Sequence, residues 1–186
     1  MIIRLADCPS QPWKNGLGRT REIAVHPTLA HGDDFDWRVS IAEVDSAAPF
    51  SLFPGIDRQI ALLDGAGFTM TLDDGRIHAL TTPFAPFAFP GEAKVTVALA
   101  GGPTRDFNLM LRRARVRGEV QAWTEAGTRT MAAGTALVFC ARGAIDTADG
   151  QLQAGDAWRP DAAGAVEITL HDATVALVVR VEAVAG

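Results

Sequence analysis

Residues 68–80 read Phe-Thr-Met-Thr-Leu-Asp-Asp-Gly-Arg-Ile-His-Ala-Leu, and this stretch decides the fold class. Its first part alternates apolar and polar side chains, so that Phe68, Met70 and Leu72 share one face of an extended strand. The Asp-Asp-Gly that follows is typical of a tight turn, and a second short run of strand type comes after it. The stretch therefore predicts a β-hairpin with one buried face.

The same rhythm of short strands and turns extends from this hairpin along the whole chain. Alternating or apolar runs are separated by Gly, Pro and Asp turns, while segments with helical periodicity are scarce. This pattern favours a sandwich or barrel over alternating β and α units. Short helical turns are expected only near 27–34 and 102–106. The predicted strands lie at 37–42, 60–63, 68–72, 76–80, 87–89, 95–99, 107–111, 120–123, 136–139, 166–170 and 175–181.

The strand rhythm also suggests two β-rich halves. A second tight-turn signal, Asp149-Gly150, echoes Asp74-Gly75 in the later part of the chain. We expect an N-terminal half, 1–113, that carries the candidate pocket, and a C-terminal half, 114–186, packed with it as one compact unit. A jelly roll suits the Gly and Pro corners, and two fused jelly-roll halves suit a chain of 186 residues.

Composition and charge exclude several classes of protein. Hydrophobic residues make up 48% of the chain and charged residues 21%, which is ordinary for a globular protein. The net charge is −5 and the 17 basic residues are scattered, so no nucleic-acid partner is expected. No apolar run reaches the ~18 residues of a membrane helix, and the N-terminus lacks a signal-peptide pattern. We therefore expect a cytoplasmic protein without membrane contact.

Neither the cysteines nor the histidines form a pattern typical of a metal site. Cys8 and Cys140 lack metal-type spacing, and a pair of reduced thiols suits the cytoplasm. The histidines, at 26, 31, 78 and 171, form no His-x-His pair and have no carboxylate at ligand spacing. A Gly-x-Ser-x-Gly motif is absent from the sequence as well. The sequence predicts no metal, no other cofactor and no catalytic residue.

The densest group of polar side chains is 13–22, which reads Trp-Lys-Asn-Gly-Leu-Gly-Arg-Thr-Arg-Glu. Its two glycines permit unusual backbone angles and a close approach to a ligand. Lys14 and Arg21 are able to pair with a carboxylate. A polar surface loop leading into an edge strand explains the same pattern, and composition alone leaves both interpretations open. Three further side chains are able to orient a ligand by hydrogen bonds: Asn15, Thr20 and Glu22.

Two further segments combine apolar and polar side chains in the same ambiguous way. Arg58 precedes the apolar run 60–63, at the mouth of a buried strand. A site arginine and a surface pair with Asp57 both fit this position. In 105–113, strand alternation puts Phe107 on an apolar face and Asn108 on a polar one. That polar face fits a ligand-lined interior or solvent.

Four ordered blocks of the sequence resemble the HutD/Ves family. The first, 13–23, follows the pattern Trp-Lys-Asn-Gly-x-Gly-x-Thr-Arg-Glu-Ile, and the second, 36–42, reads Asp-Trp-Arg-Val-Ser-Ile-Ala. The third, 50–58, follows Phe-Ser-x-Phe-Pro-Gly-x-Asp-Arg, and the fourth, 102–110, follows Gly-Pro-x-x-Asp-Phe-Asn-Leu-Met. Their order and approximate spacing match the family over about residues 10–113. Leu17 stands where a third glycine is expected.

The resemblance implies a cupin-type fold, as a double jelly roll or bicupin, without the usual cupin metal ligands. It also implies a regulatory role in histidine utilisation. Binding of urocanate, or of a related intermediate such as formate or a formylated amino acid, would limit the free level of that compound. The implied partner is thus a small carboxylate, and a homodimer is compatible with this role. The Ves branch of the family implies a stress-related role instead.

The ligand-binding residues expected from the resemblance combine the three polar segments with the second block. Cationic side chains would take the carboxylate of urocanate, acidic or amide side chains its ring nitrogens, and phenyl rings its planar face. Two alternatives stay open: a cupin-like isomerase or hydrolase that acts on a small acid with Glu22 as general base, and an interaction module without a ligand. The expected binding residues are Lys14, Asn15, Thr20, Arg21, Glu22, Ser40, Phe50, Arg58, Phe107 and Asn108.

Overall fold

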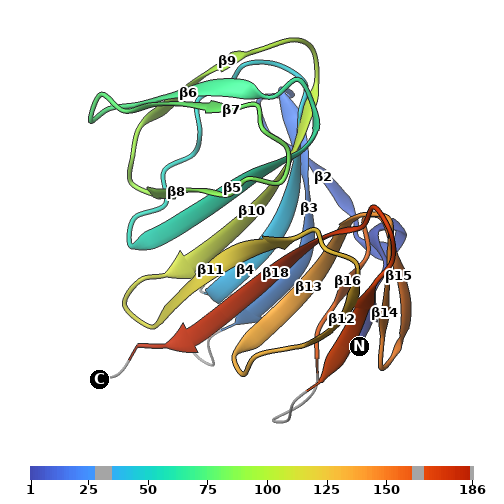
Figure 1. Ribbon diagram of the computed structural model, residues 1–186. Helices are drawn as coiled ribbons and strands as arrows, with labels where there is room; N and C mark the ends of the chain where they lie inside the picture. Colours follow the sequence, from blue (N-terminus) through green and yellow to red (C-terminus); the bar gives the residue numbers. More distant parts are fainter. Residues whose placement is uncertain (28–34, 161–165, 185–186) are drawn as a thin grey trace. The chain divides into compact units, whose positions relative to one another are not determined.

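The computed structural model describes residues 1–27, 35–160 and 166–184 (Figure 1). The regular secondary structure of these residues is β-strand, apart from one short 3-10 helix, η1 (Leu5–Asp7). The all-β class predicted from strand alternation is therefore confirmed. In the described part of the chain, no helix has the length and apolarity needed to cross a membrane.

The chain divides into two compact units. One unit consists of Met1–Cys8 and Gly118–Ala183, and the other is Pro9–Arg117, which Val184 joins. The first eight residues belong with the C-terminal part of the chain because β1 (Ile2–Ile3) pairs with β16 (Ala157–Trp158).

A six-stranded antiparallel sheet dominates the Pro9–Arg117 unit. Its central strand, β10 (Thr104–Arg112), lies between β4 (Phe35–Val44) and β5 (Ile56–Gly65). In Figure 1, β3, β4, β10 and β5 run side by side. The remaining strands of this sheet are β3 (Gly18–Pro27), which pairs with β4, β2 (Ser10–Pro12) beyond it, and β8 (Phe87–Pro90) beside β5.

The predicted hairpin supplies the central strand and one edge strand of a second, three-stranded sheet in the same unit. This sheet has the order β7 (Ile77–Leu80), β6 (Phe68–Leu72), β9 (Val95–Leu99). At the turn between β6 and β7, Gly75 has φ +87°, a backbone angle that favours glycine. The Asp74 carboxylate accepts a hydrogen bond from the Arg76 backbone N–H at 3.0 Å. Turn chemistry in the sequence thus fixes the register of the hairpin.

An apolar cluster joins these two sheets. Phe68, Met70 and Leu72 of β6 share one face, as predicted, and none is more than 2% exposed. They pack with Ile60 and Leu62 of β5 in one buried cluster. The six-stranded sheet is therefore packed on one face against the hairpin of β6 and β7.

The unit of Met1–Cys8 and Gly118–Ala183 has a five-stranded and a four-stranded sheet. The predicted turn at Asp149-Gly150 joins β14 (Ala144–Thr147) and β15 (Gly150–Gln153). Its core cluster is apolar, and Trp158 is the largest of its side chains. The other strands of this unit are β11 (Val116–Trp123), β12 (Gly127–Thr130), β13 (Thr135–Arg142), β17 (Glu167–Leu170) and β18 (Val175–Ala183).

One local expectation was wrong. The helical turn predicted near 102–106 is instead a bend followed by β10, which begins at Thr104. Thr104 pairs with Val44 on one side and with Gly65 on the other, and this pairing on both sides outweighs local propensity. The other helical turn, expected near 27–34, lies outside the described residues except for Pro27, the last residue of β3.

The core cluster between the two sheets makes a testable prediction. Phe68 has no exposed surface, so Phe68→Ala should leave a cavity and destabilise the protein by roughly 3–5 kcal/mol in urea unfolding. Ile77, on the same hairpin, is 70% exposed, and Ile77→Ala should change the free energy of unfolding by less than about 0.5 kcal/mol. Equal losses in the two variants would contradict the packing described here.

Candidate functional site

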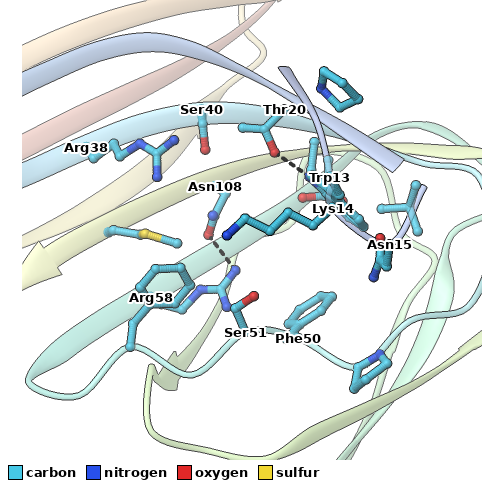
Figure 2. A pocket seen from close by; sticks show the side chains of 17 residues that line it. Trp13, Lys14, Asn15, Thr20, Arg38, Ser40, Phe50, Ser51, Arg58 and Asn108 are labelled. Carbon is cyan, nitrogen blue, oxygen red and sulfur yellow. Dashed lines mark hydrogen bonds between the residues drawn. The ribbon is translucent and has the colours of Figure 1, made fainter. Parts of the chain in front are cut away.

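A cavity of about 460 Å³ lies against the six-stranded sheet of the Pro9–Arg117 unit (Figure 2). This volume is within the range of roughly 300–1,000 Å³ that is usual for small-molecule sites. Its floor is the sheet formed by β3, β4, β10 and β5. Its walls are the turn between β2 and β3, which carries Trp13, and the segment between β4 and β5, which carries Phe50.

Strand register decides which polar side chains meet on the floor of this cavity. Asn108 of β10 is paired with Ser40 of β4. Alternate residues of a strand point to the same face, so Asp106 and Met110 face the cavity together with Asn108. Met110 is in turn paired with Arg58 of β5. The floor therefore gathers side chains from β4 and β5, which follow one another in the sequence, and from the distant β10.

Arg58 is a buried cation enclosed by aromatic rings. It is 7% exposed, and its guanidinium carbon lies 5.0, 5.5 and 4.9 Å from the ring centres of Phe50, Phe53 and Phe89. Its Nη2 donates a hydrogen bond to Asn108 Oδ1 at 3.3 Å. Among the described residues, its Nε has no hydrogen-bond partner. Burial lowers the pKa of Arg58 to about 10, so the side chain stays charged at neutral pH.

Asp106 is a buried acid on the same floor. It is 2% exposed, and its Oδ2 has no hydrogen-bond partner within the described part of the chain. Burial raises the pKa of Asp106 to about 7, although the positive charge of Arg58 acts in the opposite direction. Desolvation thus outweighs the attraction between the two charges. The cavity therefore contains a buried donor, Arg58 Nε, and a buried acceptor, Asp106 Oδ2, that are not hydrogen-bonded to each other.

The turn of the first sequence block builds one wall. The Trp13 backbone N–H donates to Gly18 O at 2.9 Å, and the Trp13 indole N–H donates to Thr20 Oγ1 at 2.8 Å. A Cβ on Gly18 would lie 2.8 Å from the Trp13 ring and 2.5 Å from Glu43 O, so a side chain at this position would displace the wall. In Figure 2, Lys14 extends from this turn toward Asn108 and Arg58.

The segment between β4 and β5 builds the opposite wall. Phe53 N–H donates to Gly91 O at 2.8 Å. The Gly55 backbone N–H donates to the Glu92 carboxylate at 2.9 Å, and Arg113 binds the same carboxylate at 3.0 Å. These hydrogen bonds, with that of Arg113 the strongest, lower the pKa of Glu92 to about 2. The wall that places Phe50 and Phe53 around Arg58 is therefore fastened where it leads into β5.

The cavity gathers seven of the ten side chains predicted to bind a ligand, from β3, β4, β5, β10 and the two walls. Of these, Asn15 also stabilises its own turn, because its Oδ1 accepts the Leu17 N–H at 3.0 Å. The seven that line the cavity are Lys14, Asn15, Thr20, Ser40, Phe50, Arg58 and Asn108. Ligand binding by these residues stays a prediction.

The other three predicted residues do not line the cavity. Phe107 is fully buried on the opposite face of β10, as its place between Asp106 and Asn108 requires. Arg21 lies on the opposite face of β3 from Thr20, where its Nε is 3.7 Å from the Glu43 carboxylate. Glu22 accepts a hydrogen bond of 2.8 Å from Arg38 Nε beside the cavity.

Ten lining residues were not among the predicted binding residues, and Trp13, Arg38 and Asp106 are three of these ten. Strand alternation could have found two of them, because Asp106 is two residues before Asn108 and Arg38 two before Ser40. The charged side chains that line the cavity are the cations Lys14, Arg38 and Arg58 and the acid Asp106. The excess of positive charge favours an anionic ligand.

Among the described residues, no three histidine, cysteine, aspartate or glutamate side chains gather in a way that could hold a metal ion. The side chains of Cys8 and Cys140 are both buried. Burial raises the pKa of Cys140 to about 12, so this thiol has little nucleophilic character at neutral pH.

Comparison with known proteins relates the chain to one family. The family model described as HutD matches residues 5–178. An uncharacterized 21.2 kDa protein in the hutC 3' region of Pseudomonas putida is 39% identical over 146 residues, which cover 78% of this chain and 75% of that protein. The protein Ves of Cronobacter sakazakii is 39% identical over 137 residues, 73% of each chain. The resemblance seen in the four sequence blocks is confirmed.

Solved structures agree with this relation. The structure of HutD from Pseudomonas fluorescens SBW25, in a formate condition, has a TM-score of 0.85 and 30% identity, with 100% of this chain and 99% of that chain covered. The bacterial pirin YhhW from Escherichia coli, in complex with nickel(II), is 8% identical with a TM-score of 0.62, and 97% of each chain is covered. This second likeness concerns the fold alone and confirms the expected cupin-type fold.

The buried carboxyl of Asp106 gives a prediction for stability. Its pKa is about 7 in the folded protein, above the ordinary 3.8, so the folded state binds more protons between about pH 4 and 7. The contribution of the Asp106 carboxyl to the free energy of unfolding is therefore fully present below about pH 4 and is lost as the pH rises through about 7. Relative to Asp106→Asn, the wild type should lose roughly 3–4 kcal/mol of unfolding free energy between pH 4 and pH 8.

Urea unfolding at several pH values checks this prediction, because all other titrating groups are shared by the two proteins. Asp73→Asn is the matched control, since Asp73 is exposed on the turn between β6 and β7, and its profile should follow the wild type. A wild-type minus Asp106→Asn difference that is constant from pH 4 to pH 8 would show that Asp106 titrates as an ordinary carboxyl.

Proposed function

Because this chain belongs to the HutD family, we propose that it binds a small carboxylate of histidine utilisation. The proposed ligand is urocanate or a related intermediate, such as formate or a formylated amino acid. Binding lowers the free concentration of that compound, and the protein in this way regulates the flux through histidine degradation. This role belongs to a binding protein, and it requires no chemical step.

Arg58 is the observation that carries this proposal. A guanidinium that is 7% exposed has lost most of its hydration, which makes its attraction to an anion stronger than in water. Three phenyl rings surround it, and its Nε is unpartnered among the described residues. A carboxylate accepts paired hydrogen bonds from a guanidinium in a geometry that suits both groups. A small anion in the cavity therefore offsets the cost of burying this charge.

The remaining lining residues suit a planar acid such as urocanate. Lys14 extends toward Arg58 and Asn108 in Figure 2 and supplies a second positive charge for the carboxylate. Phe50 offers a ring face for stacking on a conjugated ligand. Relatives point to the same class of role, since one is named HutD and another is encoded in the hutC 3' region.

The proposed binding is independent of a metal ion. The polar lining groups are cations, amides and hydroxyls with a single carboxyl. A cupin metal site uses about three or four imidazole or carboxylate ligands that converge on the ion. Recognition by charge and hydrogen bonding is what the lining residues are able to supply.

One observation favours a second candidate, an enzyme that acts on a small organic acid. A buried carboxyl with a pKa of about 7, such as Asp106, is able to act as a general base near neutral pH. An absorbance time course of urocanate separates the two candidates. A binding protein leaves the absorbance constant at catalytic protein concentrations, whereas an isomerase or hydrolase depletes the compound over many turnovers.

Calorimetric titration with urocanate tests the proposed role of Arg58. Arg58→Met keeps an apolar side chain of similar length among the three phenyl rings. It should weaken binding by at least about 30-fold, because a buried charge-assisted contact is lost. Arg76→Gln removes an arginine from the exposed turn between β6 and β7 and should bind like the wild type.

Two results would contradict the proposal in different ways. Equal affinities for urocanate in the wild type and Arg58→Met would show that Arg58 does not contribute to binding. Absence of binding by the wild type to urocanate, formate and N-formylglutamate at millimolar concentration would remove the proposed function itself.

A further inference from the structure

We propose that Asp106 is a specificity-determining residue of this pocket, which accepts a hydrogen bond from an N–H group of a ligand whose carboxylate is held at Arg58. The inference rests on the proposed function, because it concerns the same pocket. It narrows the ligand class to small carboxylates that carry an N–H donor, such as an imidazole or a formamide.

The first observation is a pair of complementary groups that do not bond to each other. Arg58 Nε is a buried donor and Asp106 Oδ2 a buried acceptor, and neither has a hydrogen-bond partner among the described residues. Both side chains line one cavity, and both are more than nine-tenths buried. Buried polar groups in proteins are almost always hydrogen-bonded. A single ligand with an acceptor at one end and a donor at the other satisfies both.

The second observation is that three other acceptors in or beside the cavity are already engaged. Asn108 Oδ1 accepts from Arg58, and Thr20 Oγ1 accepts from the Trp13 indole. The Glu22 carboxylate accepts from Arg38, at the edge of the cavity. Asp106 is therefore the acid on the cavity floor whose Oδ2 is able to accept a hydrogen bond from a ligand.

The charges that face Asp106 explain why a bare anion is the poorer ligand. Lys14 from the turn between β2 and β3, Arg38 from β4 and Arg58 from β5 supply the positive charge of the lining, and Glu22 of β3 is bound to Arg38. A carboxylate at Arg58 places a second negative charge near Asp106, which disfavours the ionised form of Asp106. A ligand N–H directed at Oδ2 offsets this repulsion, and a ligand without one does not.

Two matched pairs of compounds test this preference at pH 8, where an imidazole is neutral and still has one N–H. The first pair is urocanate and 3-(3-furyl)acrylate, whose ring has no N–H. The second pair is N-formylglycine and N-formylsarcosine, which differ by methylation of the amide nitrogen. Calorimetry should show that the wild type binds the N–H member of at least one pair about 10- to 100-fold more tightly than its partner, as expected for a hydrogen bond to a charged group.

Substitution of Asp106 should remove this preference. Asp106→Leu deletes the acceptor with little change of volume, and the two members of each pair should then bind within about threefold of each other. If the leucine variant does not fold, Asp106→Ala, which also lacks an acceptor, decides, with an expected preference below about threefold. Asp73→Asn, on an exposed turn, should keep the wild-type preference.

The outcomes separate this inference from the proposed function. Binding of all four compounds without an N–H preference overturns the inference and leaves the function standing. A preference that persists in the Asp106 variants does the same. If the formamide pair shows the Asp106-dependent preference and urocanate does not bind, the inference stands and the assignment of urocanate is wrong. If none of the four compounds binds, the inference is wrong, and the titrations with formate and N-formylglutamate decide whether the proposed function is wrong as well.

Discussion

Keeping a guanidinium charged while it is out of water is the constraint on which the pocket depends. The guanidinium of Arg58 is stabilised by contacts with phenyl rings and by a hydrogen bond to the amide oxygen of Asn108. Neither contact carries a full negative charge, so the positive charge is only partly compensated. The Asp106 carboxyl does not compensate it fully either, because desolvation pushes that group toward its neutral form. The unit therefore folds with an electrostatic demand that a small anion is suited to meet.

The surrounding structure serves to hold this arrangement in place. The phenyl rings near Arg58 come from the segment between β4 and β5 and from β8, and hydrogen bonds to Gly91 and Glu92 fasten that segment. On the other side, the turn after β2 positions Trp13 through its hydrogen bond to Thr20. Backbone contacts that are too close for a Cβ explain why glycine occupies position 18 in this wall. Recognition is thus built on two short segments anchored to a rigid sheet, an arrangement that keeps a binding site preorganised.

The two units of the chain use the same strand-rich architecture to different ends. In the unit of Met1–Cys8 and Gly118–Ala183, a cluster of apolar side chains that includes Trp158, Leu152 and Ile168 forms the core. In the Pro9–Arg117 unit, the apolar cluster around Phe68 and Ile60 gives way to polar side chains along β10, β4 and β5. The polar residues that the cavity requires, and with them the four sequence blocks, fall within the second of these units.

The sequence by itself determined the all-β class and the hairpin at 68–80, because strand alternation and turn chemistry are local properties of the chain. Alternation left the polar segments open between a binding site and a surface, and the resemblance of the four blocks to a family pointed to them as the lining of a pocket. The sequence also placed Asn108 opposite Phe107 on β10, since neighbouring residues of a strand face opposite sides. Tertiary structure decided the rest. Glu22 and Arg21 share the sequence block of Lys14, but partners from β4 engage them, Arg38 for Glu22 and Glu43 for Arg21. Asp106 and Arg58 became one site only through the pairing of β10 with β5, a contact between distant segments that no local pattern encodes.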